Sequence, residues 1–102
     1  MEEKLKALCD KITQQGQGRL KKEGLGCQVN LDHAIAHYKI GNKYIKIDVG
    51  NSGRYMIDKT GQIFGIKAYG VIHPGLYYGT MDTINDYYWG DYQAHKLEAV
   101  NV

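Results

Sequence analysis

Apolar residues recur with two different periods along this chain, and the first period predicts an N-terminal helix over residues 2–15. Its apolar stripe consists of Leu5, Leu8, Cys9 and Ile12. Their spacing of i, i+3, i+4 and i+7 places them on one face of an amphipathic helix. Glu2 and Glu3 favour the positive end of the helix dipole. Gly16 and Gly18 are expected to end the helix, and residues 19–23 can add a helical turn before Gly24 and Gly26.

From about residue 28 the period changes to two, which is typical of strands with one buried face. Residues 44–49 alternate cleanly, and a two-residue turn at Gly41-Asn42 would join them to residues 34–40 as a hairpin. That turn pairs Tyr38 with Ile45, Ala36 with Ile47 and Ala34 with Val49. All six side chains then lie on one face, so the turn and the alternation agree.

Two further turns continue the meander. A three-residue loop at 51–53 predicts a bulged hairpin that pairs Val49 with Tyr55 and Ile47 with Ile57, and a third turn follows at 58–61. Residues 62–73 are apolar on both faces. We therefore expect the helix to cover one face of the sheet and the C-terminal segment to cover part of the other.

These elements predict an α+β fold, in which an N-terminal helix packs on an antiparallel β-meander of about four to five strands. The 102 residues, 43% of them hydrophobic, are expected to form a single domain. It divides into a helical region (1–24), the meander (28–73) and an aromatic, acidic C-terminal segment (74–102).

Charge and tyrosine content separate the two ends of the chain. Residues 1–67 carry a net charge of +5 and residues 68–102 a net charge of −3. Six of the nine tyrosines lie in the second part, against one phenylalanine in the whole chain. Tyrosine combines an apolar ring with a polar tip, which suits half-buried and interface positions.

The N-terminus, MEEKLKALC, is charged where a signal peptide is apolar, and no apolar run is long enough to span a bilayer. We expect a cytoplasmic protein that does not bind membranes. Cys9 and Cys27 form no CxxC pair and are expected to be small buried residues in a reducing compartment. No cofactor is indicated.

Candidate catalytic and metal-binding residues lack the spacing that such sites need. His33 and His37 would share a helix face as zinc ligands do, but the segment is predicted to be a strand and lacks the glutamate of HExxH. The acid–base candidates are His73, His95, Asp82, Asp86 and Asp91. No nucleophile elbow, phosphate-binding loop or dinucleotide motif accompanies them. A small hydrolase-like enzyme that uses His and Asp is therefore the least favoured hypothesis.

Two surfaces remain as binding candidates. The first is a partner-binding set of aromatic residues: Tyr77, Tyr78, Tyr87, Tyr88, Trp89 and Tyr92. Tyr and Trp are enriched at interface hot spots, with Trp89 expected to be the anchor. The second is a basic sheet face for a nucleotide or single-stranded nucleic acid: His37, Lys39, Tyr44, Lys46, Arg54 and Lys67.

The run GRYMIDKTGQIFGIKAYGVIHPGLYYGTMDTI (residues 53–84) resembles the small uncharacterised accessory proteins of bacteriophages and mobile elements. The resemblance covers under a third of the chain and implies a bias towards small inhibitors or sequestering proteins in a host cytoplasm. The favoured hypothesis is a non-enzymatic protein that binds a macromolecule, preferably a protein, through the aromatic set. Nucleic-acid or nucleotide binding on the basic face is the alternative, and self-association is compatible with either.

Overall fold

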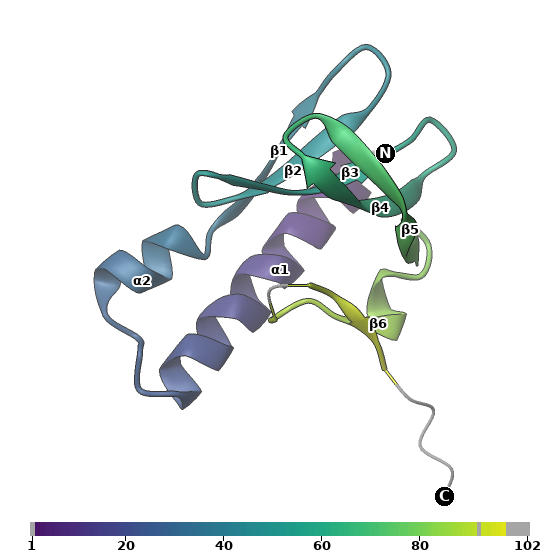
Figure 1. Ribbon diagram of the computed structural model, residues 1–102. Helices are drawn as coiled ribbons and strands as arrows, with labels where there is room; N and C mark the ends of the chain where they lie inside the picture. The colour runs from purple at the N-terminus through teal and green to yellow at the C-terminus, as the bar shows by residue number, and fades with distance from the viewer. Residues whose placement is uncertain (1, 92, 98–102) are drawn as a thin grey trace, which may run out of the picture.

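The computed structural model describes residues 2–91 and 93–97 as a helix against an antiparallel sheet (Figure 1). The helices are α1 (Glu2–Lys22) and α2 (Gln28–His33). The sheet has the spatial order β1 (Ala36–Ile40), β2 (Ile45–Val49), β3 (Ser52–Ile57), β4 (Gln62–Ala68), β5 (Val71–Thr80). A 3₁₀ helix, η1 (Ile84–Asp86), leads into the short hairpin of β6 (Tyr87–Tyr88) and β7 (His95–Lys96). The predicted α+β class is confirmed.

The helix α1 forms where the apolar stripe predicts it, and all four residues of the stripe are buried. The prediction that Gly16 and Gly18 end it is wrong. A Cβ added at Gly16 would lie 3.7 Å from the Cβ of Ala34, so this part of the helix packs closely on the chain that follows. Such packing offsets the roughly 1 kcal/mol that a glycine costs inside a helix. The helix ends before Gly24, whose φ of 77° is typical of a helix C-terminus.

The helix α2 corrects the expected start of the meander at residue 28. None of its residues is buried and no side chain caps its N-terminus, so the segment lacks the usual sequence signals of a helix. Cys27, directly before it, is exposed, whereas Cys9 is buried as expected. Ala34 follows α2 as its C-cap and does not belong to β1.

The hairpin of β1 and β2 has the predicted faces but a different register. Ala36 pairs with Val49 and Tyr38 with Ile47, a shift of two residues from the predicted pairs. Since side chains alternate with a period of two, this even shift leaves every residue on its predicted face. The loop is longer than predicted, and the Gly41 N–H donates a hydrogen bond to the Tyr44 carbonyl at 3.0 Å.

The turn between β2 and β3 is also displaced, because β3 already begins at Ser52. Gly50 adopts a φ of 61°, and a Cβ there would lie 2.6 Å from the His33 carbonyl oxygen. The turn is therefore fitted against the end of α2, which the local sequence does not reveal. Ile47 pairs with Tyr55 and Asp48 with Gly53, so Arg54 is the extra residue of a bulge inside the strand. The bulge predicted at the turn that ends in Gly53 is therefore wrong in position, and the predicted pairs with Tyr55 and Ile57 are displaced by two residues.

The third turn is confirmed at residues 58–61. The Asp58 carboxylate accepts hydrogen bonds from the N–H groups of Thr60 (3.0 Å) and Gln62 (2.9 Å), and these bonds hold its pKa below the usual value although burial acts in the opposite direction. A fourth turn at Tyr69 and Gly70 then joins β4 to β5.

The core lies between α1, the inner face of the sheet and the C-terminal segment. The most enclosed large side chains include Trp89, Tyr55, Leu5, Leu8, Ile47 and Ile63. Figure 1 shows α1 and β6 on the same side of the sheet. The expectation that the C-terminal segment covers the other face is therefore wrong. Neither helix in the described residues is long and apolar enough to cross a membrane.

The outer face, opposite α1, is partly covered by the turn that joins β4 to β5. A Cβ at Gly53 would lie 2.7 Å from the Tyr69 ring and 3.1 Å from Ile66, so these side chains pack directly on β3. Met56 on this face is only 2% exposed. Apolar residues on both faces of β3 and β4 thus reflect burial from both sides, with the sheet's own hairpin as the second cover.

Candidate functional site

One row of side chains crosses the outer face through all five strands. Lys39 pairs with Lys46, Lys46 with Met56, Met56 with Phe64, and Phe64 with Tyr77. Because paired residues of adjacent strands lie side by side on one face, these five residues form a line of pairs, which we call the outer row. Met56 at its middle is buried, so the accessible side chains lie towards the two ends. The outer row is about 19 Å long at the usual strand separation. One end is basic and the other is aromatic.

Two lysines directly opposite each other form the basic end. Such a pair of like charges is destabilising across two strands. The Lys46 ammonium lies 4.8 Å from the centre of the Tyr69 ring, and Lys43 in the preceding loop lies 5.4 Å from the Tyr44 ring. Tyrosine faces attract cations but carry no net charge. The positive charge at this end of the outer row is therefore not neutralised by these contacts.

Asp48 is the acidic residue beside the lysine end. Its Oδ2 lies 3.8 Å from His37 Nε2 and accepts a 3.4 Å hydrogen bond from the Tyr69 hydroxyl. Its Oδ1 is buried without a hydrogen-bond partner among the described residues. The carboxylate therefore orients His37 and Tyr69, and both side chains are exposed next to the lysines.

Two rings form the aromatic end. Phe64 and Tyr77 have centroids 5.5 Å apart with ring planes inclined at 55°, and Tyr77 is 48% exposed. Tyr69, at 55%, is also open to solvent. Sequence reasoning missed Phe64 and Tyr69 as surface rings, because apolar positions on both faces indicated burial. The pairing of Phe64 with Tyr77 across the sheet depends on bulges in β4 and β5 that no local signal marks.

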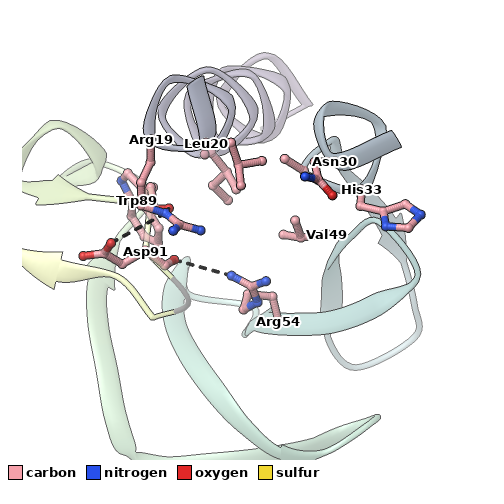
Figure 2. A pocket seen from close by; sticks show the side chains of 12 residues that line it. Arg19, Leu20, Asn30, His33, Val49, Arg54, Trp89 and Asp91 are labelled. Atoms are coloured by element: carbon pink, nitrogen blue, oxygen red, sulfur yellow. Dashed lines mark hydrogen bonds and ion pairs between the residues drawn. The ribbon is translucent and has the colours of Figure 1, made fainter. Parts of the chain in front are cut away.

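The predicted basic face is assembled only in part. His37, Lys39 and Lys46 share the outer face, with Tyr44 in the adjacent loop. Arg54 does not join them: it is the bulge residue, and it donates a 3.5 Å hydrogen bond to the Asp91 carbonyl on the side of α1 (Figure 2). Lys67 is exposed near the turn that follows β4, where the β4–β5 register shifts.

The aromatic set of the C-terminal segment is divided between core and surface. Trp89 is 1% exposed and Tyr78 7%, so neither ring offers a surface for a macromolecular partner. The Trp89 ring packs edge-on against Tyr55 at 5.3 Å, and its Nε1 donates to the Ile84 carbonyl. Tyr77 lies on the outer row, Tyr87 and Tyr88 are half-buried, and Tyr92 falls outside the described residues.

Burial alters the acidity of two enclosed tyrosines and of one cysteine. Burial raises the pKa of Tyr55 to about 12, against the opposing effects of Arg54 and of a hydrogen bond from the Ala94 N–H. Burial also raises the pKa of Tyr78. Burial, with Asp10 adding to it, raises the pKa of the Cys9 thiol to about 11. This cysteine is therefore protonated near neutral pH and is not an activated nucleophile.

Two of the five acid–base candidates, His95 and Asp91, lie beside each other. His95 Nδ1 lies 3.5 Å from Asp91 Oδ2, but His95 is exposed and the Asp91 carboxylate also faces Arg19. The His73 ring instead accepts a hydrogen bond from the Gly75 N–H, and Asp82 pairs with Lys4. No group of three His, Cys, Asp or Glu side chains among residues 2–91 and 93–97 could hold a metal ion.

Comparisons with protein-family models, with curated proteins and with solved structures returned no match for this chain. The outer row therefore has to be interpreted from its own chemistry.

Proposed function

We propose that this protein is a small non-enzymatic binding protein that holds a single-stranded nucleic acid on the outer row. The observation that supports this is the continuous pairing of two lysines with two surface rings across five strands. Single-stranded nucleic acids are bound by cations that contact phosphates and by rings on which bases stack. Lys39 and Lys46 supply the first, and Phe64 and Tyr77 supply the second.

The electrostatics support the same choice. The two lysines repel each other in the free protein. A phosphate bound between them would reduce this repulsion. The Lys46 ammonium lies against the Tyr69 ring, and Tyr69 is 55% exposed and so open to a ligand. The overall charge of +2 is small, so the binding we propose is local and depends on this face.

Protein binding through exposed aromatic residues is the second candidate, because Tyr77 is half exposed and Tyr87 and Tyr88 are partly so. Burial of Trp89 removes the expected anchor from this surface. The accessory or inhibitor role suggested by the resemblance to phage proteins is compatible with either candidate and stays a prediction.

The test is a titration of a fluorescently labelled single-stranded oligonucleotide, followed by anisotropy at several salt concentrations. Two phosphate contacts give a slope of log affinity against log salt of about −1.4. The double variant Lys39→Gln/Lys46→Gln should lose this dependence and most of the affinity. Tyr77→Ala should weaken binding by about 1–3 kcal/mol through the loss of stacking, with the salt slope unchanged.

The matched control removes two positive charges elsewhere. Lys6 and Lys22 are exposed on α1, away from the outer row, so Lys6→Gln/Lys22→Gln should bind as the wild type does. If both double variants lost the same affinity for the oligonucleotide, the effect would be explained by net charge and not by the outer row. No binding at low salt would exclude the proposal and leave the protein partner as the remaining candidate.

A further inference from the structure

A cavity lies on the inner side of the sheet, the side that α1 covers (Figure 2). It is enclosed by the C-terminal half of α1, α2, the β2–β3 region and the C-terminal segment. Its volume is about 220 Å³. This is below the roughly 300–1,000 Å³ of pockets that take drug-sized molecules, so an occupant has to be small.

One part of the wall of this cavity is apolar, and the rest carries polar and charged side chains, among them the Asp91 carboxylate. Leu20, Val49 and Trp89 line the apolar part, together with Ile12 and Ala34 from the edge of the core. Leu20 and Val49 face the cavity in Figure 2. Trp89 is fixed by hydrogen bonds from its backbone N–H to Gln15 and from its indole to Ile84. These hydrogen bonds hold Trp89 in place in the apolar part of the wall.

Two arginines stand at one side of the cavity, both directed at the Asp91 segment (Figure 2). Arg19 donates to the Gly90 carbonyl at 2.7 Å and to Glu23 at 3.0 Å, and its Nε is 3.7 Å from Asp91 Oδ1. Its two hydrogen bonds within the described residues use two of the five N–H donors of a guanidinium. Arg54 reaches the same segment through a 3.5 Å bond to the Asp91 carbonyl oxygen, and its guanidinium also acts on the neighbouring Tyr55 hydroxyl.

The β-bulge explains why Arg54 is here. In a regular strand, Arg54 and Tyr55 would point to opposite faces, and Tyr55 belongs to the inner core. The extra residue at the bulge turns Arg54 to the same side as Tyr55. Bulges commonly re-aim a side chain next to a binding site.

From this geometry we propose that the cavity binds a small carboxylate with an apolar body. The carboxylate accepts hydrogen bonds from Arg54 and Arg19, for which planar guanidinium groups are well suited. The apolar body lies against Leu20, Val49 and Trp89. This site is separate from the outer row and does not depend on the function proposed for it.

The single tryptophan makes the proposal directly measurable, because it lines the cavity. Benzoate is the probe, and its binding to the whole protein should change the Trp89 emission in a saturable way below about 10 mM. Benzyl alcohol, which has the ring without the charge, should bind at least about tenfold more weakly, and so should inorganic phosphate, which has the charge without the ring.

Arg54→Met should weaken benzoate binding by about tenfold or more. Lys6→Met removes the same charge from a distant turn of α1 and should leave binding unchanged. If Arg54→Met does not fold, Arg54→Lys keeps the charge but not the planar fork, and should bind several-fold more weakly than wild type.

Three results would overturn the proposal. They are the absence of a saturable change in emission with benzoate, equal binding of benzyl alcohol, and unchanged benzoate binding in a folded Arg54 variant. Binding of phosphate as tight as that of benzoate would show that the apolar wall plays no part.

Discussion

Both faces of the five-stranded sheet carry aromatic side chains, which are buried on one face and exposed on the other. On the inner face, Tyr55, Tyr78 and Trp89 pack edge-on against one another and are almost fully enclosed. On the outer face, Tyr69 and Tyr77 are about half exposed, and Lys46 lies against the Tyr69 ring. The same residue types therefore serve stability on one face and are available for binding on the other. The abundance of tyrosine alone does not distinguish these roles.

The largest expected effect separates the two faces by stability. Trp89→Ala should lower the free energy of unfolding by about 3–5 kcal/mol, because it removes a large ring from an enclosed core. Tyr77→Ala should cost about 1 kcal/mol or less, since only its contact with Phe64 and half of its surface are lost. Urea unfolding followed by circular dichroism measures both. Similar losses for the two variants would contradict the contrast between the faces.

Alkaline pH should act on the inner face next. The pKa of Tyr55 is about 12 in the folded protein and about 10 when unfolded, so the neutral phenol is favoured by folding. Its contribution is complete below pH 10 and is lost as the pH rises through 12. At about 1.4 kcal/mol for each unit of pKa difference, the loss is roughly 3 kcal/mol.

Tyr55→Phe provides the control for this effect. The variant should be less stable than wild type at neutral pH, because the buried Ala94 N–H loses its acceptor. Its free energy of unfolding should nevertheless fall less steeply between pH 10 and 12. Parallel stability curves for the two proteins would show that Tyr55 does not cause the alkaline loss.

The smallest effect concerns the outer face. Lys39→Gln removes one of two like charges that face each other, so it should raise the free energy of unfolding by a few tenths of a kcal/mol at low salt. The gain should vanish near 1 M salt, where screening acts within about 3 Å. Lys59→Gln, at an exposed turn, is the comparison and should change little. A clear loss of stability in Lys39→Gln would mean that the lysine pair is structural.

Much of this fold could be predicted from periodicity alone. The spacing of Leu5 and Leu8 located α1, and alternation placed Ile47 and Tyr55 on the inner face even though both hairpin registers were displaced by two residues. A register shift of two residues leaves every side chain on the same face, so alternation cannot detect it. The length of each loop was decided by contacts between distant segments, such as Gly50 against the carbonyl of His33.

The candidate site was less accessible to sequence reasoning. Lys39 and Lys46 could be placed on one face from alternation. Arg54 could not be assigned to the opposite side, because a bulge reverses alternation without a unique sequence signal. Trp89 resembled an interface residue by type, and only the position of the C-terminal segment beside α1 shows it to be core.

The position of Trp89 also has a consequence for the order of events during synthesis. Residues 36–80 form a sheet of sequential neighbours, whose contacts are local and form early. The apolar stripe on α1 is synthesised before the sheet. Trp89, which covers one side of this stripe, is added only later. Until residue 89 has been made, a nascent chain therefore carries an incompletely covered apolar surface on this helix, to which chaperones can bind.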